Sequence, residues 1–328
     1  MIRRVALGLT LLFAAQSIAA QGSRAGILLT LPPSTRALGL GDAAAAAVSD
    51  EWALFSSPAQ LARANRFSAG LASEAYLAAT QLSAVAVAIP LWRGTLGVGA
   101  TLLDYGSVKE IMASVSGLDG IETGRTVSAQ DDAVAVGFGM PIPWAWGLRG
   151  GVAVEMLRTR VADLSASGVA ASFGVAWTAQ SGWDVAAAVQ HVGDAIALGA
   201  TSGPLPLVLR GAVAAPAMHF GSATARPMAE LRSARGGVVS GTGAAEASWP
   251  GVRGAEFVAR AAYTVRGSGD DHWPLSLGAG VVMGRFTVDY AMERFVRLDQ
   301  VTHRIGIRFA RPSVVASSVS AASTVPAR

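Results

Sequence analysis

The sequence predicts an all-β fold, a transmembrane antiparallel β-barrel of about 14 strands with a small N-terminal helical plug in its lumen. The chain is apolar, with 52% hydrophobic and only 15% charged residues, whereas about 25% charged residues is usual in a soluble protein. After residue 20, no stretch reaches the ~20 apolar residues that a spanning helix needs. The C-terminal strands alternate apolar and charged side chains with a period of two, as a wall between lipid and lumen requires.

Residues 1–20 are typical of a signal peptide, which is removed from the mature protein. Arg3 and Arg4 give a basic start, 5–15 form an apolar core, and small residues at 17–20 suit cleavage. A buried N-terminal helix is the alternative. The leader indicates an envelope protein. The chain has no cysteine and no basic run, so we expect neither a disulfide framework nor a nucleic-acid partner.

Residues 21–65 precede the strands and form the predicted plug, or hatch. A glycine turn at 39–41 opens a small-residue helix expected over 42–48, and an acidic pair ends it. A second short helix is expected to start at Ser57, whose side-chain oxygen caps it, with proline at its first position. The plug residues to which we assign a role are Arg36, Gly39, Gly41, Asp42, Asp50, Glu51, Ser57 and Pro58.

Residues 66–310 form the predicted barrel, in which strand-sized runs alternate with turns. The segment 109–132 is polar and contains glycine, so we expect one short strand and a loop there, and further loops over 192–206 and 236–243. The other predicted strands are 66–75, 80–92, 94–105, 133–142, 146–162, 165–179, 183–191, 207–215, 223–234, 254–266, 274–283, 285–297 and 301–310. Residues 311–328 form a Ser/Ala/Val-rich tail that we expect to be disordered.

Charged residues on the last strands are expected to face the lumen. A soluble β-sandwich would alternate too, but strands of about ten residues or more suit a tilted membrane crossing. A closed barrel also pairs every backbone group in lipid. Charges within the membrane are costly unless they face such an interior. We therefore expect an ion-pair network against the plug from Glu256, Arg260, Asp289, Glu293, Arg304 and Arg308.

The chain shows no pattern typical of an enzyme. Its four histidines have no metal-ligand spacing, and no nucleophile lies at a diagnostic distance from an acid or base. The pairs at 131–132 and 270–271 lie in polar segments, where we expect solvated acids. We predict no enzymatic activity, no cofactor and no metal site. The residues expected to form an interfacial girdle near strand ends are Trp144, Trp146, Trp183, Trp249 and Trp273.

Four groups of motifs occur in an order found in a known family. They are RALGLGDA at 36–43 with an acidic pair at 50–51 and SPAQL at 57–61; LDYG at 103–106; VQHVG at 189–193 with LPLVLRG at 205–211; and GAEF at 254–257 with VDYA at 288–291 and HRI at 303–305. They resemble the PorV/PorQ-type outer-membrane proteins, which are similar in turn to the FadL fatty-acid transporter barrels. Ser57 departs from the family pattern, which has Asn there.

The resemblance implies a fourteen-stranded barrel with a hatch in the bacterial cell outer membrane, in contact with outer-membrane lipid. A PorV/PorQ-type protein would serve type IX protein secretion and surface display, docking exported proteins that carry a C-terminal sorting signal and meeting other secretion-system subunits. A FadL-like protein would instead transport hydrophobic small molecules. A structural barrel without a ligand is the third alternative. The family commonly ends at an aromatic residue, a place that Phe309 would take here.

Overall fold

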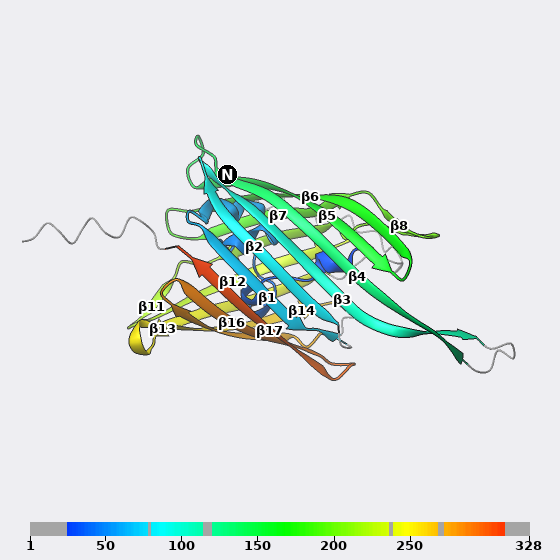
Figure 1. The fold of residues 1–328 in the computed structure, drawn as a ribbon. Coiled ribbons are helices and arrows are strands. Elements are labelled where there is room, and N and C mark those ends of the chain that lie inside the picture. Colours follow the sequence, from blue (N-terminus) through cyan, green and yellow to red (C-terminus); the bar gives the residue numbers. More distant parts are fainter. Residues whose placement is uncertain (1–24, 78–79, 114–119, 236–238, 268–271, 312–328) are drawn as a thin grey trace, which may run out of the picture.

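The computed structural model describes residues 25–77, 80–113, 120–235, 239–267 and 272–311. The predicted signal peptide and nearly all of the predicted tail lie outside these residues. Over the described chain, 14 antiparallel strands form a closed barrel, which confirms the predicted fold (Figure 1). The wall strands are β1 (Ser68–Ala75), β2 (Gln81–Leu91), β3 (Gly94–Ala113), β4 (Gly120–Pro141), β5 (Leu148–Val161), β6 (Leu164–Thr178), β7 (Asp184–Gly193), β10 (Val208–Ala214), β12 (Ala223–Ala234), β13 (Ser240–Pro250), β14 (Glu256–Arg266), β15 (Leu275–Met283), β16 (Phe286–Phe295) and β17 (Gln300–Ala310).

The barrel closes where the first strand meets the last. β1 pairs with β17 along its whole length, from Ser68 opposite Ala310 to Ala75 opposite His303. We call the end where β1 begins and β17 ends the terminal end, and the opposite end the far end. The hairpin of β3 and β4 extends past the other strands at the far end (Figure 1).

Three short strands lie outside the regular wall. β11 (Met218–Phe220) pairs with β12 beyond the end of β10, and Pro216, which has no amide proton to donate, lies between β10 and β11. β8 (Ile196–Leu198) and β9 (Thr201–Gly203) form a small hairpin in the connection from β7 to β10. This connection brings Ile196 and Leu205 into the lumen, where both are buried.

Residues 25–65 lie inside the barrel and are called the plug below (Figure 1). The plug contains η1 (Ile27–Thr30), α2 (Thr35–Gly39), η2 (Glu51–Phe55) and η3 (Pro58–Arg63), and a further turn, η5 (Val252–Gly254), joins β13 to β14. Within the described residues, no helix has the length and apolar character needed to cross a membrane. η3 lies against β3 to β6, and α2 lies against β14 to β17.

Two glycines of the wall allow η3 to approach the strands closely. A Cβ atom at Gly139 or Gly151 would overlap the backbone of Pro58. Glycine on a strand commonly marks such an approach of another backbone segment. The sequence of the wall is therefore fitted to the plug at these positions.

The outer surface is apolar and meets lipid. Leu71, Val154, Val175 and Ile305 point outward with about half of their surface exposed. Four of the predicted girdle tryptophans are exposed at the terminal end, and Trp273 is exposed at the far end. Trp92, in the turn after β2, is 99% exposed at the terminal end and was not among the predicted girdle residues. A band of this kind flanked by aromatic residues is the outer surface of a membrane barrel.

Two strand assignments made from the sequence are wrong, and the two errors cancel in the total number of strands. The polar segment 109–132 holds no separate short strand, because β3 and β4 continue through it as a long hairpin. Conversely β13 covers the second half of the predicted loop 236–243 and the residues after it. Its sequence, SGTGAAEASWP, has small side chains and little apolar alternation. Pairing with β12 and β14 requires a strand there, because a membrane barrel cannot leave an edge open.

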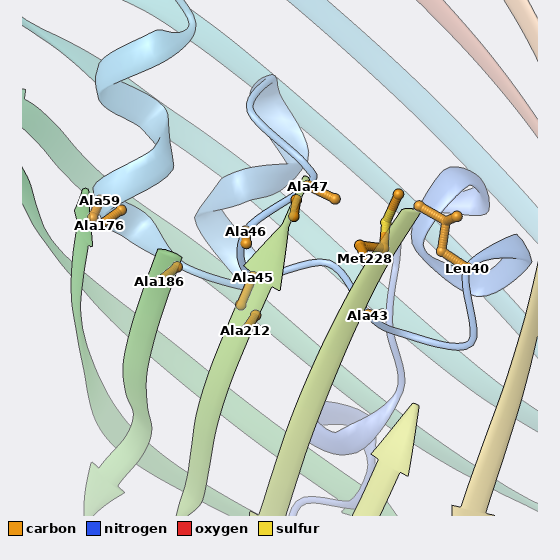
Figure 2. Close-up of a cluster of buried hydrophobic side chains, with 11 residues drawn as sticks. Leu40, Ala43, Ala45, Ala46, Ala47, Ala59, Ala176, Ala186, Ala212 and Met228 are labelled. Carbon is orange, nitrogen blue, oxygen red and sulfur yellow. The ribbon is translucent and has the colours of Figure 1, made fainter. Parts of the chain in front are cut away.

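The predicted helix over 42–48 is also wrong, since the α-helix lies earlier, at α2. Ser34 caps α2 by accepting a hydrogen bond from the amide of Ala37, and the left-handed Gly41 and Asp42 end it. The alanine run that follows packs against small side chains of the wall (Figure 2). Side chains satisfy its backbone groups: Glu230 accepts from the Ala45 amide at 2.9 Å, and Gln60 donates to the Ala45 carbonyl at 3.3 Å. Packing overrides the high helix propensity of alanine here.

Candidate functional site: the plugged lumen

Arg36 joins the plug to the wall through a chain of charged side chains. Its guanidinium donates to both carboxylate oxygens of Glu246 on β13, at 2.8 and 2.7 Å. Glu246 also accepts from Arg260 on β14 at 2.6 Å, and Arg260 donates to Asp289 on β16 at 2.6 Å. Each charge therefore has a partner of opposite sign. A bidentate Arg–carboxylate pair fixes geometry as well as charge.

A second cluster surrounds Asp42 at the glycine turn of the plug. Arg210 on β10 donates to the Asp42 carboxylate at 2.6 Å, and Arg232 on β12 donates to it at 3.1 Å. Arg210 also donates to Glu230 at 2.8 Å and to Gln190 at 2.7 Å. Glu230 is the group that holds the alanine run, so this cluster fixes both the turn and the segment after it.

The acidic pair of the plug lies against Arg308 of β17. Asp50 accepts from Arg308 at 3.3 Å and from the Trp52 amide at 3.1 Å, which caps η2, and Arg36 lies 3.8 Å from its carboxylate. Glu51 is fully buried, with its carboxylate oxygen 3.8 Å from the Arg308 guanidinium. Burial raises the pKa of Glu51 to about 8, the neighbouring Asp50 carboxylate adds to the rise, and Arg308 opposes it.

The end of the plug is held by a cluster that the sequence analysis did not identify. Asp184, at the start of β7, accepts from Arg63 of η3 at 2.5 Å and from Arg226 of β12 at 2.6 Å. Arg149 lies 3.5 Å away on the same carboxylate. The Asp184 side chain is 2% exposed. One buried carboxylate thus holds three arginines, one of which belongs to the plug.

Arg304 of β17 contacts the plug and β1 at once. It is 2% exposed, donates to Glu74 on the neighbouring strand, and also donates to the carbonyl of Pro32 in the plug. Two other residues assigned to the lumen make none of the hydrogen bonds described above. Glu256 lines the lumen at the start of β14, and Glu293 lies on β16 opposite Thr302.

Ser57 differs from its predicted role. It occupies the N-cap position of η3 and is buried, and Pro58 follows at the first position, but the Ser57 hydroxyl makes no capping hydrogen bond. The sequence analysis missed most wall partners of the plug. Glu230 lies on a predicted strand and could have been found from alternation, whereas Glu246 lies on the strand that was not predicted. In the part of the chain that the structure describes, no three His, Cys, Asp or Glu side chains gather as a metal would require.

Within the described part of the chain, two spaces of the lumen have opposite character. The terminal-end cavity, of about 400 Å³, is lined by the charged groups of the plug and of β12 to β17. The far-end recess, of about 680 Å³, is mainly apolar. Its lining includes Ala25 to Ile27 of the plug, Val161, Leu164 and Ile196, while Asp131 there accepts a hydrogen bond from Tyr105 at 2.9 Å. This pair, together with Thr159 and Thr201, interrupts the apolar lining.

An apolar layer lies beside the far-end recess, and Ala25 and Ile196 belong to both. Leu28 of the plug packs inside the lumen with Leu103, Leu157 and Leu205, each 2% exposed or less. Leu205 belongs to the connection between β7 and β10, so a wall loop and the plug close the lumen together. An ion entering this layer would lose its hydration without gaining a partner, whereas an apolar molecule would not.

No protein-family model matches the sequence, and no curated protein matches it. Solved structures resemble the fold. The toluene transporter TodX of Pseudomonas putida gives a TM-score of 0.54 at 10% identity, over 84% of this chain and 98% of that chain. A FadL homologue of Pseudomonas aeruginosa gives 0.52 at 11% identity, over 84% and 96%. A TodX mutant, described as a monoaromatic hydrocarbon channel, gives 0.53 at 11% identity, over 79% and 94%.

The fold and the internal segment define a class: an integral membrane β-barrel that is filled by its own N-terminal residues. At such low identity the likeness to solved structures establishes the fold alone, and that fold is FadL-like. A closed antiparallel barrel with an apolar outer band is the architecture of bacterial outer membranes. The protein is therefore an outer-membrane β-barrel with a FadL-like fold.

Proposed function

We propose that this barrel carries hydrophobic small molecules across the outer membrane. The observation that carries the proposal is the far-end recess, an apolar space whose inner lining includes the first described residues of the plug. We place the far end outside the cell, because outer-membrane barrels have short periplasmic turns and longer extracellular segments. The similar solved structures, a toluene transporter and a monoaromatic hydrocarbon channel, agree with this substrate class.

In this proposal the recess captures the molecule and the plug gates its passage. The apolar layer around Leu28 admits an apolar solute and excludes ions. The plug fills the lumen, and the Arg36, Asp42 and Asp184 clusters hold it there. At least part of the plug must therefore shift for a molecule to pass. We expect this movement near Ala25 to Leu31, which contains no charged side chain and is held by apolar packing and by a hydrogen bond from Arg232 to the Thr30 carbonyl.

The test is uptake by cells that lack the gene and carry a plasmid copy. Leu164→Asp places a charge in the recess, and Leu298→Asp makes the same change at an exposed far-end turn outside the recess. We expect uptake of radiolabelled toluene to be restored by wild type and by L298D but not by L164D. Heat-modifiable migration of membrane extracts checks that each variant folds. Equal uptake by L164D and L298D would contradict the proposal.

The PorV/PorQ-type motifs imply a different function, protein secretion, and the same strains separate the two. Secreted and surface proteins with a C-terminal sorting signal are profiled in parallel with uptake. Loss of their processing in the deletion strain, with toluene uptake unchanged, would replace transport by secretion. If the deletion strain is unchanged in both assays, the remaining function is that of a structural barrel without a ligand. None of these functions requires enzymatic activity, and we propose none.

A further inference from the structure

A groove of about 610 Å³ lies on the lipid-facing surface of the barrel, over β17 and β1 to β4. Small side chains form its floor where the neighbours are large. Ser73, Ser83 and Ala100 point outward in the groove, and Leu71, Val85 and Ile305 rise beside them with 61%, 38% and 57% of their surface exposed. The surface is almost wholly apolar, which suits an acyl chain.

The groove does not lead into the lumen. Its strands pair without a break: Ser73 is opposite Ser83 across β1 and β2, and Ser83 is opposite Leu102 across β2 and β3. The ladder between β2 and β3 continues from Gln81 to Leu91. With the wall closed, the occupant of the groove comes from the membrane. This distinguishes it from any solute that crosses the lumen.

Register shows that the groove ends at a polar boundary on the outer surface. The row across the sheet through Ser73 and Ser83 continues to Leu102, Asp132 and Arg158. The next outward row toward the far end contains Gln81, Asp104, Gln130 and Arg160. The row toward the terminal end contains Leu71, Val85, Ala100, Val134 and Met156. The change from apolar to polar side chains marks the level at which hydrocarbon gives way to head groups.

Two arginines lie at this boundary beside the groove. Asp132 lines the groove and accepts a hydrogen bond from Arg160 at 2.9 Å. Arg158 is directly opposite Asp132 in the ladder, is exposed, and has no ion pair within the described part of the chain. Asp132, Arg158 and Arg160 together therefore carry a net positive charge. The planar guanidinium binds phosphate in a bidentate manner, which suits a phosphorylated head group.

We infer that the groove and Arg158, with Arg160, form a binding site for a phosphorylated, acylated glycolipid of the outer leaflet, lipid A. One acyl chain fills the groove, and a lipid phosphate binds the arginines. The site lies nearer the far end, which we place outside the cell, so the outer leaflet supplies the ligand. This inference does not depend on what the barrel transports.

The test uses the full-length barrel purified from outer membranes, with bound lipid A counted by native mass spectrometry. Arg158→Gln with Arg160→Gln removes the phosphate contacts, and Ser83→Phe fills the groove while leaving both arginines. Arg93→Gln is the matched control, since Arg93 is exposed in the turn after β2 at the terminal end. We expect the double variant to retain less lipid A than wild type by a factor of about ten or more, because two cations at a membrane surface contribute that much to lipid binding. S83F should also lose lipid A, and R93Q should retain it.

Two results would overturn the inference. Equal lipid A retention by the double variant and R93Q would show that the arginines bind no phosphate. Re-addition of lipid A or phosphatidylglycerol to delipidated barrel distinguishes the sources. Preferential, arginine-dependent retention of phosphatidylglycerol would replace lipid A by a glycerophospholipid. Heat-modifiable migration identifies folded barrel in every sample, and only that fraction is counted.

Discussion

Arg36 and Glu246 lie 210 residues apart in the sequence and form a two-pronged pair between the plug and β13. About one-fifth of each side chain is exposed, so we expect Arg36→Gln to weaken the seating of the plug by on the order of 2 kcal/mol, between the values for exposed and buried pairs. Ion conductance through the barrel in planar bilayers should rise. Conductance unchanged from wild type, in a folded barrel, would show that this pair does not hold the plug.

Asp184→Asn should destabilise the barrel more than any exposed charge change. The substitution leaves Arg63, Arg149 and Arg226 around a neutral group, and breaking a buried pair costs about 3–5 kcal/mol. We expect the temperature at which the folded band disappears on a gel to fall clearly. Asp163→Asn is the control, since the Asp163 side chain is 75% exposed in its pair with Arg125. An equal shift for both variants would contradict the assigned role.

Glu51 predicts a pH dependence of the plug. Its pKa is about 8 in the seated plug, against an ordinary value of 4.5, because of burial and the facing Asp50, with Arg308 opposing the rise. The seated state therefore binds the extra proton. The contribution of protonated Glu51 to the stability of the seated plug is complete below the ordinary pKa of 4.5. It is lost as pH rises through about 8. We expect conductance to increase from pH 5 to pH 9.

Glu51→Gln should remove most of this dependence, since the amide cannot titrate. Glu122→Gln is a matched change on β4, where the side chain is 58% exposed and pairs with Lys109. That variant should keep the wild-type pH profile. If E51Q and wild type gain conductance equally with rising pH, another group controls the plug.

Gly151→Ala tests the close approach between η3 and the wall. The added methyl group would overlap the backbone of Pro58, and forcing extra atoms into a packed site costs about 1–3 kcal/mol. We expect faster cleavage of the plug by protease added to the purified barrel. Gly211→Ala on β10 is the control, because an added Cβ there meets nothing within 4 Å. Identical cleavage rates for the two variants would mean that η3 tolerates displacement.

The sequence predicts the wall better than its contents. Strict alternation on the last strands is enough to place Arg260 and Arg304 on one face, because a pleated strand leaves no other arrangement. The same reasoning fails for β13, whose small residues show no contrast between faces. It also fails for 42–48, where alanine favours a helix but Glu230 and Gln60 hold the chain in turns. The partners of the plug come from strands far along the chain, and no local pattern pairs Arg63 with Asp184.

The contact of Arg304 with both Pro32 and Glu74 has a consequence for how the barrel is made. Arg304 lies on the strand synthesised last, and its two partners lie in the plug and on the strand synthesised first. The Glu74 pair forms when the seam between β1 and β17 is shut, and the Pro32 contact forms only when the plug is inside. A barrel that sealed before its N-terminal residues entered would keep the Glu74 pair but leave Arg304 without the Pro32 carbonyl. The complete set of Arg304 contacts therefore belongs only to a barrel that is both sealed and filled.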